Sequence, residues 1–226
     1  MGKRGPKPGF NAKRRVSEKW RPELAYAIGL LATDGCLSPP GHLINLTSKD
    51  KEQLENLSRC IGLTLRIGKK SSGFGTVKKY LCVQLKSVLF YDFLISVGLT
   101  PAKSKTLGPL KIPRKYFFDF LRGVFDGDGS TYSYWDPRWR SSFMFYVQFA
   151  SASPGFLNWL RESIKADLRV EGHITTANGQ STSQLKYAKA EGIKVLRRMY
   201  KRSGLVHLSR KRLKIEKMLR IVGQSL

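Results

Sequence analysis

The chain of 226 residues is long enough for one large domain or for two domains of about 100 residues each. Hydrophobic residues make up 41% of it, which excludes disorder over the whole length. With 41 Lys and Arg against 16 Asp and Glu, the formal net charge is +25. Such a charge predicts a polyanionic partner, nucleic acid first, with an anionic membrane surface and a merely solubilising charge as alternatives.

Localisation signals are not apparent in the sequence. No apolar run reaches the ~18 residues of a membrane span, and no apolar segment follows the basic N-terminus. The three cysteines are an odd number without CxxC spacing, which favours reduced thiols. We therefore expect an intracellular protein, cytoplasmic or organellar, that does not contact membranes and is not secreted.

The first part of the chain alternates between helical and strand patterns. Residues 1–21 are rich in Lys, Arg, Gly and Pro and are typical of a flexible basic arm. The pattern then predicts a buried helix at 24–33, a strand at 42–48, a helix at 49–62, a hairpin from 63–70 and 76–85, and a helix at 87–99. Residues 100–113 hold three prolines and little periodicity, as expected of a linker.

The same order of patterns then returns. It predicts an apolar helix at 116–125, a strand at 141–151, a helix at 154–168, two strands at 168–177 and 181–189 around Asn178-Gly179, and a helix at 192–204. A basic helix at 207–222 follows. Repetition on this scale predicts two similar units related by a pseudo-two-fold axis.

The strongest motif is present once in each unit. GLLATDG (29–35) and GVFDGDG (123–129) are apolar helix ends closed by Asp-Gly, and their acids Asp34 and Asp128 are 94 residues apart. If Gly29 faces Gly123, the two helices can approach closely and the two carboxylates become neighbours. Close carboxylates repel unless a cation lies between them, so the pair predicts a site for a hard divalent metal.

At these residues the sequence resembles the LAGLIDADG homing endonucleases in their single-chain form. AIGLLATDG (27–35) and LRGVFDGDG (121–129) stand where the family has its motif, and the resemblance covers roughly residues 22–205. It implies an α+β fold of two pseudo-symmetric αββαββα halves, each with a four-stranded antiparallel sheet, packed through the motif helices. The expected parts are an arm (1–21), a first half (22–99), a linker (100–113), a second half (114–205) and a C-terminal helix (206–226).

The resemblance also implies a function. It is site-specific hydrolysis of both strands of duplex DNA, with Mg²⁺ or, in the same site, Mn²⁺ or Ca²⁺, leaving short 3′ overhangs in the course of intron homing. The partner would be a long pseudo-palindromic or asymmetric site, and the protein a monomer. An RNA maturase of the same fold and a non-cleaving DNA-binding protein are the alternatives. The presence of both acids favours the nuclease.

Site residues follow from the resemblance. Asp34 and Asp128 would be catalytic and would hold the metal, whereas Asp126 is set aside because its counterpart is Ala32. Lys186 is the candidate basic residue of the active site. Ser48 and Ser151 stand where the family often has a Gln that orders water.

Basic residues on the predicted hairpins and on the C-terminal helix are candidates for DNA contact. They are Arg66, Lys69, Lys70, Lys78, Lys79, Arg138, Arg140, Arg210, Lys211 and Lys214. Four aromatic residues join the second group, and ordinary packing is their alternative role: Tyr132, Tyr134, Trp135 and Trp139. For the C-terminal helix the alternative is a solvated face.

Overall fold

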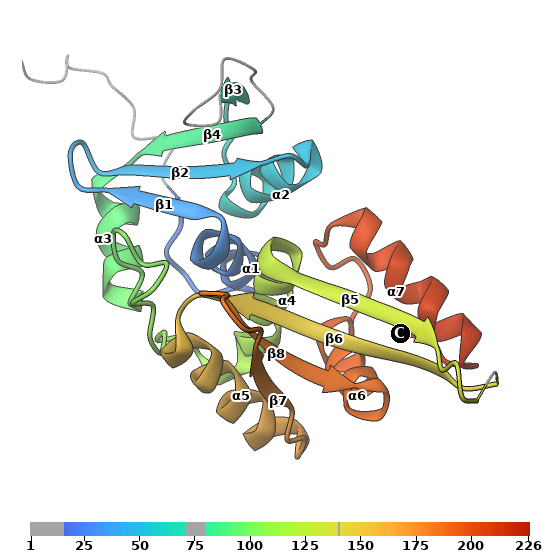
Figure 1. Cartoon of the computed structure of the whole chain (residues 1–226). Coiled ribbons are helices and arrows are strands. Elements are labelled where there is room, and N and C mark those ends of the chain that lie inside the picture. Colours follow the sequence, from blue (N-terminus) through green and yellow to red (C-terminus); the bar gives the residue numbers. More distant parts are fainter. Residues whose placement is uncertain (1–15, 71–79, 140) are drawn as a thin grey trace, which may run out of the picture.

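A computed structural model describes residues 16–70, 80–139 and 141–226, and Figure 1 shows its two units around a central pair of helices. The first unit consists of α1 (Pro22–Thr33), β1 (Gly35–Ser38), β2 (Leu43–Ser48), α2 (Lys51–Ile61), β3 (Gly68–Lys70), β4 (Tyr80–Lys86) and α3 (Val88–Val97).

The second unit repeats this order after the linker and a 3-10 turn, η1 (Arg114–Tyr116). It consists of α4 (Phe117–Asp128), β5 (Gly129–Trp135), β6 (Phe143–Ser151), α5 (Pro154–Leu168), β7 (His173–Thr176), β8 (Ser183–Ala188) and α6 (Lys189–Met199). The helix α7 (Ser209–Ile221) follows it and lies alongside β5 (Figure 1).

Each unit contains one antiparallel sheet with the same strand order, β1-β2-β4-β3 in the first and β5-β6-β8-β7 in the second. Side chains alternate along each strand. In β6, Phe143, Phe145 and Val147 are buried, and α5 and α6 cover that face of the sheet. Met144, Tyr146 and Gln148 lie on the other face, which we call the open face. The expected α+β fold of two αββαββα units is therefore confirmed.

The motif helices α1 and α4 pack against each other in the middle of the molecule (Figure 1). Every residue of α1 from Leu24 to Ala32 is buried, as its continuous apolar sequence requires. Gly29 and Gly123 lie at the crossing, where a Cβ added to Gly123 would be only 3.0 Å from the Cα of Gly29. Only residues without a side chain allow this approach.

Several element boundaries differ from those predicted by the sequence. The helix α4 does not end before Asp126 but continues to Asp128. The strand expected at 63–70 is limited to β3, because Leu63, Leu65 and Ile67 pack on the core without joining the sheet. Residues 16–21 of the expected arm are also packed: Val16 is 2% exposed, and Trp20 stacks on Tyr116. Among the described residues, no helix combines the length and apolar character needed to span a membrane.

Candidate active site

The two motif acids lie at the ends of the crossing helices. Asp34 caps the C-terminus of α1, and Asp128 is the last residue of α4. Gly127 lies directly against the first acid, since a Cβ at this position would be 3.2 Å from Oδ2 of Asp34. The close packing of the helices thus brings together two carboxylates that are 94 residues apart in the chain.

Both acids are harder to ionise than ordinary aspartates. Burial raises the pKa of Asp34, although the Gln53 side chain, which donates to its Oδ2 at 2.7 Å, opposes the shift. Burial and the neighbouring Asp34 charge together raise the pKa of Asp128 to about 6. Asp128 is nevertheless open to solvent on one side. Two carboxylates this close repel each other when both are ionised, and a cation bound between them would stabilise the ionised pair.

Two lysines lie beneath the acids in corresponding places. Lys103 Nζ donates to the backbone oxygen of Gly35, and Lys211 Nζ donates to that of Gly129 at 2.6 Å. Gly35 and Gly129 are the same position of the repeat, the residue after the motif acid. Lys211 also donates to the oxygens of Phe125 and Gly127. The charges of both lysines lower the pKa of both acids.

The lysines are themselves partly or fully enclosed. Lys103 is buried, and burial lowers its pKa. Burial also lowers the pKa of Lys211, to about 8.

Both lysines follow a Gly-Leu pair that comes after the last helix of a unit. Lys103 is five residues after Gly98, and Lys211 is seven after Gly204. This weak correspondence is the signal in the sequence that could have identified them.

Gln53 is a further residue that the sequence analysis did not identify. Gln53 does not belong to the repeated motif. It lies in the first turn of α2, five residues after Ser48. The Ser48 hydroxyl donates to Oε1 of Gln53 at 2.6 Å, which leaves the amide nitrogen directed at Asp34. At the corresponding place of the second unit, five residues after Ser151, stands the buried Phe156. Asp128 therefore lacks the amide that Asp34 has.

Lys186 and Asp126 have different surroundings. Lys186 is on the open face of the second sheet, opposite Gln148 on one side and His173 on the other. Gln148 in turn pairs with Ser130, two residues after Asp128, and the role of Lys186 in the active site stays a prediction. Asp126 is buried and accepts hydrogen bonds from the Tyr26 hydroxyl and the Leu208 backbone N–H, both at 2.7 Å. Its contacts are those of a residue that joins α1, α4 and the segment before α7.

A cavity of about 230 Å³ opens beside Asp128. Asp128 and Lys103 line it together with Thr33 from the end of α1 and with Ser151 from the end of β6. The site thus combines two carboxylates, one on either side of the helix crossing, with amine cations and a hollow that solvent can enter. It provides oxygen ligands for a hard cation and positive charge for an anionic substrate.

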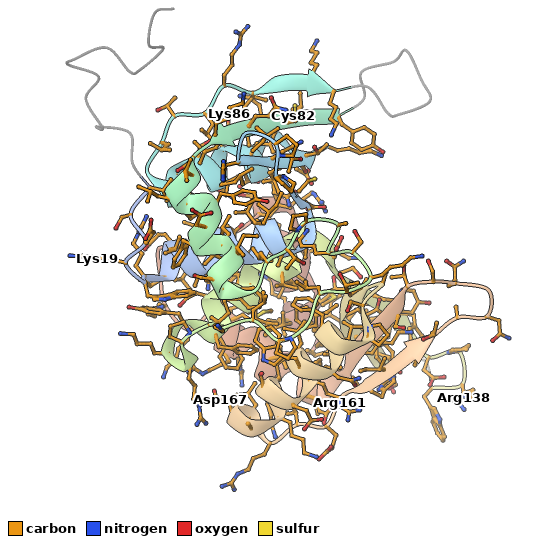
Figure 2. The ribbon with its side chains drawn as sticks, turned by 90° about the vertical axis from the view of Figure 1, so that its left-hand side faces the viewer. Lys19, Cys82, Lys86, Arg138, Arg161 and Asp167 are labelled. Atoms are coloured by element: carbon orange, nitrogen blue, oxygen red, sulfur yellow. The ribbon has the colours of Figure 1, made fainter. Side chains whose placement is uncertain are left out.

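The basic residues expected at DNA occupy three kinds of position. Lys70 is on the open face of the first sheet, whereas Lys69, its neighbour in β3, points to the opposite face. Arg66 precedes β3, and Arg138 lies at the far end of the β5–β6 hairpin, where it pairs with Asp136 at 3.0 Å (Figure 2). Lys78, Lys79 and Arg140 are outside the described residues.

The N-terminal part of α7 makes internal contacts instead. Arg210 pairs with Asp50 at 2.6 Å, and Lys214 donates to the backbone oxygen of Thr131. With Lys211, these residues connect the start of α2 to the edge strand β5.

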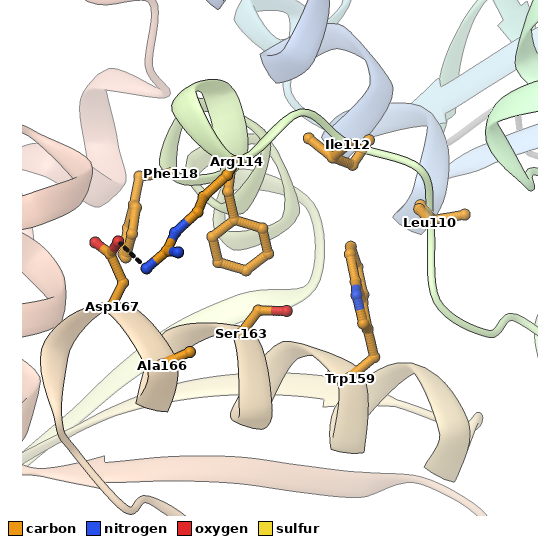
Figure 3. A pocket seen from close by; sticks show the side chains of 9 residues that line it. Leu110, Ile112, Arg114, Phe118, Trp159, Ser163, Ala166 and Asp167 are labelled. Carbon is orange, nitrogen blue, oxygen red and sulfur yellow. Dashed lines mark ion pairs between the residues drawn. The ribbon is translucent and has the colours of Figure 1, made fainter.

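A second hollow lies away from the acids, between the linker, α4 and α5 (Figure 3). Leu110, Phe118 and Trp159 contribute apolar walls, and its charged side chains, Arg114 and Asp167, face each other at 3.7 Å. We interpret it as the seam where the linker packs on the second unit.

Comparison with solved structures identifies the fold. WhiA (DUF199) from Thermatoga maritima superposes with a TM-score of 0.58 at 17% identity, over 93% of this chain and 63% of that one. The I-LtrWI LAGLIDADG homing endonuclease bound to target DNA superposes with a TM-score of 0.55 at 12% identity, over 85% of this chain and 87% of that one. The chain has the LAGLIDADG fold.

A variant of the homing endonuclease I-DmoI, in complex with its target DNA in the presence of Mg, also has this fold. It matches with a TM-score of 0.52 at 12% identity, over 79% of this chain and 95% of that one. No protein-family model and no curated protein sequence matches the chain. The chain spans less than two thirds of the length of full-length WhiA, so the match with WhiA extends to the LAGLIDADG part and not to the whole protein.

Proposed function

We propose that this LAGLIDADG protein is a metal-dependent endonuclease that cuts both strands of a long duplex DNA site and leaves short 3′ overhangs. The observation that carries the proposal is the pair Asp34 and Asp128, brought together from two units and accompanied by Lys103 and Lys211 in corresponding positions. One acid from each unit, and one lysine from the segment that follows each unit, suit a reaction that takes place twice, once on each strand.

Other properties support the same proposal. The net charge of +25 favours a polyanion, and the two open sheet faces offer strands for contact with DNA. Proteins of this fold have been solved bound to target DNA, one of them in the presence of Mg and another in the presence of Mn. We further propose a monomer, because each unit already fills the helix interface of the other.

The donor set fits a hard divalent cation such as Mg²⁺. Two carboxylates face each other, and the described residues contain no group of three or more His, Cys, Asp or Glu that could enclose a metal completely. Asp34 and Asp128 would hold the cation, and water and phosphate oxygens would complete its shell. When bound, the metal would polarise the scissile phosphate and activate water for hydrolysis.

The remaining groups prepare this site. Gln53 fixes the orientation of Asp34 through its amide. Lys103 and Lys211 donate to the backbone oxygens of the residues that follow the two acids, and Lys211 also donates to oxygens in the last turn of α4. Both lysines thereby hold positive charge beside the acids. In the transition state, the same charges would stabilise the extra negative charge on the phosphate.

The test replaces each acid by its amide. We expect Asp34→Asn and Asp128→Asn to lose double-strand cleavage while DNA affinity falls by less than about tenfold, because the amide cannot hold the cation but the sheets are unchanged. Asp92→Asn is the matched control, since Asp92 is an exposed residue of α3. A plasmid cleavage assay and a binding titration in Mg²⁺ measure the two effects. Cleavage at the wild-type rate by both single variants would contradict the proposal.

A non-cleaving DNA-binding protein is the second candidate, and one observation favours it. Lys103 and Lys211 already offset part of the charge of the acid pair, so the site is not entirely dependent on a cation. Binding of a specific duplex without cleavage in Mg²⁺ or Mn²⁺ would select this function.

A further inference from the structure

The two units differ in the length of the hairpin that follows the motif helix. Strand β5 has seven residues where β1 has four, and β6 has nine where β2 has six. In Figure 1 the β5–β6 hairpin extends well beyond the body of the second unit. Because a strand rises about 3.3 Å per residue, three added residues lengthen this hairpin by roughly 10 Å.

The strand registers show which side chains correspond in the two units. Gly35 pairs with Leu46 and Gly129 pairs with Phe149, which aligns the two hairpins. Three positions further along, Ser38 pairs with Leu43, and Tyr132 pairs with Tyr146. The second unit therefore has two tyrosines on its open face where the first has a serine and a leucine.

The added residues continue this aromatic character. Tyr134 and Met144 are the next pair on the same face of the sheet. The rings of Tyr132 and Tyr134 are 5.6 Å apart, and Tyr132 is 56% exposed. Tyr132, Tyr134, Met144 and Tyr146 form what we call the tyrosine patch. The core lies on the opposite face, where Thr131, Phe145 and Val147 are buried, so the patch does not serve the packing of the helices.

The units also differ in the strand beside this pair. Leu43 pairs with Lys86 in the first unit, whereas Ala188 stands opposite Tyr146 in the second unit. Nearer the motif helix both units are polar, with Asn45 opposite Gln84 in the first and Gln148 opposite Lys186 in the second. Gln84 and Lys86 are exposed. Amide side chains pair with adenine and lysine pairs with guanine in the major groove, whereas an apolar surface contacts the methyl group of thymine.

We propose that the tyrosine patch reads thymine methyl groups at up to three outer base pairs on one side of the DNA site. This inference rests on the proposed function, in which the protein binds DNA. It predicts that the DNA site is asymmetric. The extension of about 10 Å equals about three base-pair steps of 3.4 Å, which sets the number of pairs read. The outer base pairs on the first unit's side face no such patch, so we expect no preference for thymine there.

The first experiment uses the full chain in EDTA, so that bound DNA stays intact, with a library of randomised duplexes. The selected sites should show thymines at adjacent outer positions on one side only. Uracil is then substituted for each of these thymines, which removes the methyl group and keeps base pairing. We expect each substitution to weaken binding about fourfold, the effect of one buried methyl-sized group. Uracil in place of thymines on the other side should change affinity by less than twofold.

The second experiment gives the second unit the residues of the first. The double variant Tyr132→Ser, Tyr146→Leu should select fewer outer thymines than the wild type and should discriminate less between uracil and thymine duplexes, because only Tyr134 and Met144 of the patch remain. The variant Tyr132→Phe keeps the ring and should keep the discrimination, which controls for loss of folding. Thymine preference that is undiminished in the double variant, or a wild type indifferent to uracil, would overturn this inference alone. A wild type that selects no duplex sequence would overturn the proposed function as well.

Discussion

At the scale of the residue, Asp128 is the motif acid whose pKa is raised further. Burial and the Asp34 charge raise its pKa to about 6, and no counterpart of Gln53 stands beside it, since Phe156 occupies that place. The pair is thus unequal: one carboxylate is held by an amide and the other is exposed to solvent and to any incoming cation.

Asp128 should make the metal-free protein less stable as the pH rises. Its pKa in the unfolded chain is about 3.9, so between pH 4 and 6 the unfolded state loses this proton first and the folded state loses stability. Above pH 6, Asp128→Asn should exceed the wild type by on the order of 1 kcal/mol, a value reduced for solvent exposure, and at pH 4 the two should be equal. Urea unfolding in EDTA at pH 4, 5 and 7 measures this. A pH-independent difference would count against the raised pKa.

Lys211 should contribute to cleavage more than to binding. Lys211→Met keeps the length of the side chain but removes the charge that three backbone oxygens hold beside the acids. We expect cleavage to slow on the order of 100-fold, as when one preorganised electrostatic group is removed. Lys217→Met, an exposed lysine of the same helix, is the control and should cleave normally. Equal rates for the two variants, measured at saturating DNA, would exclude a role in cleavage.

At the scale of the element, the α1–α4 crossing depends on backbone contact. A Cβ at Gly29 would overlap the Phe120 oxygen and lie 2.7 Å from the Val124 nitrogen, and neither backbone atom can rotate away. Tyr26 and Asp126 add a hydrogen bond across the same seam. The positions of both acids are consequences of this packing.

Gly29→Ala and Gly123→Ala should each destabilise the protein by about 1–3 kcal/mol or more, as overpacking does. They should also slow cleavage, because separation of the helices moves Asp34 away from Asp128. Gly108→Ala is the control, since a Cβ there meets no atom within 4 Å. Chemical denaturation compares the three variants, and equal midpoints would show that the crossing tolerates a side chain.

At the scale of the whole molecule, much of the positive charge is available to a polyanion, but the charge of α7 is partly used internally. Arg210, Lys211 and Lys214 hold the first unit against the second through Asp50, Gly129 and Thr131. We therefore expect phosphate contact to rest more on the open sheet faces and on the basic N-terminal residues than on this helix.

DNA affinity should fall steeply with salt, with a log–log slope on the order of −6 or steeper, since each neutralised phosphate contributes about −0.9. Deletion of residues 1–15, which contain six Lys and Arg, should weaken binding to all sequences about equally and make the slope shallower. The deletion stops before Val16 because this residue is buried. Salt titrations of both chains on a preferred and an unrelated duplex measure this. A deletion that changes sequence preference would contradict it.

The architecture could be predicted from local patterns in the sequence. The repeated order of helices and strands, and the Asp-Gly ends of two apolar helices 94 residues apart, are local patterns that need no knowledge of distant contacts. Asp34 and Asp128 were identified because they belong to those patterns.

The groups around the acids could not be predicted in this way, because they come from distant parts of the chain. Lys103 is 68 residues from Gly35, and Lys211 is 82 residues from Gly129, so no periodicity connects them. Gln53 reaches Asp34 from another helix, five residues after Ser48. The physical reason is that the spacing of apolar residues specifies which face of a strand or helix is buried. Which distant residues lie beside the end of a motif helix depends instead on how the two units pack.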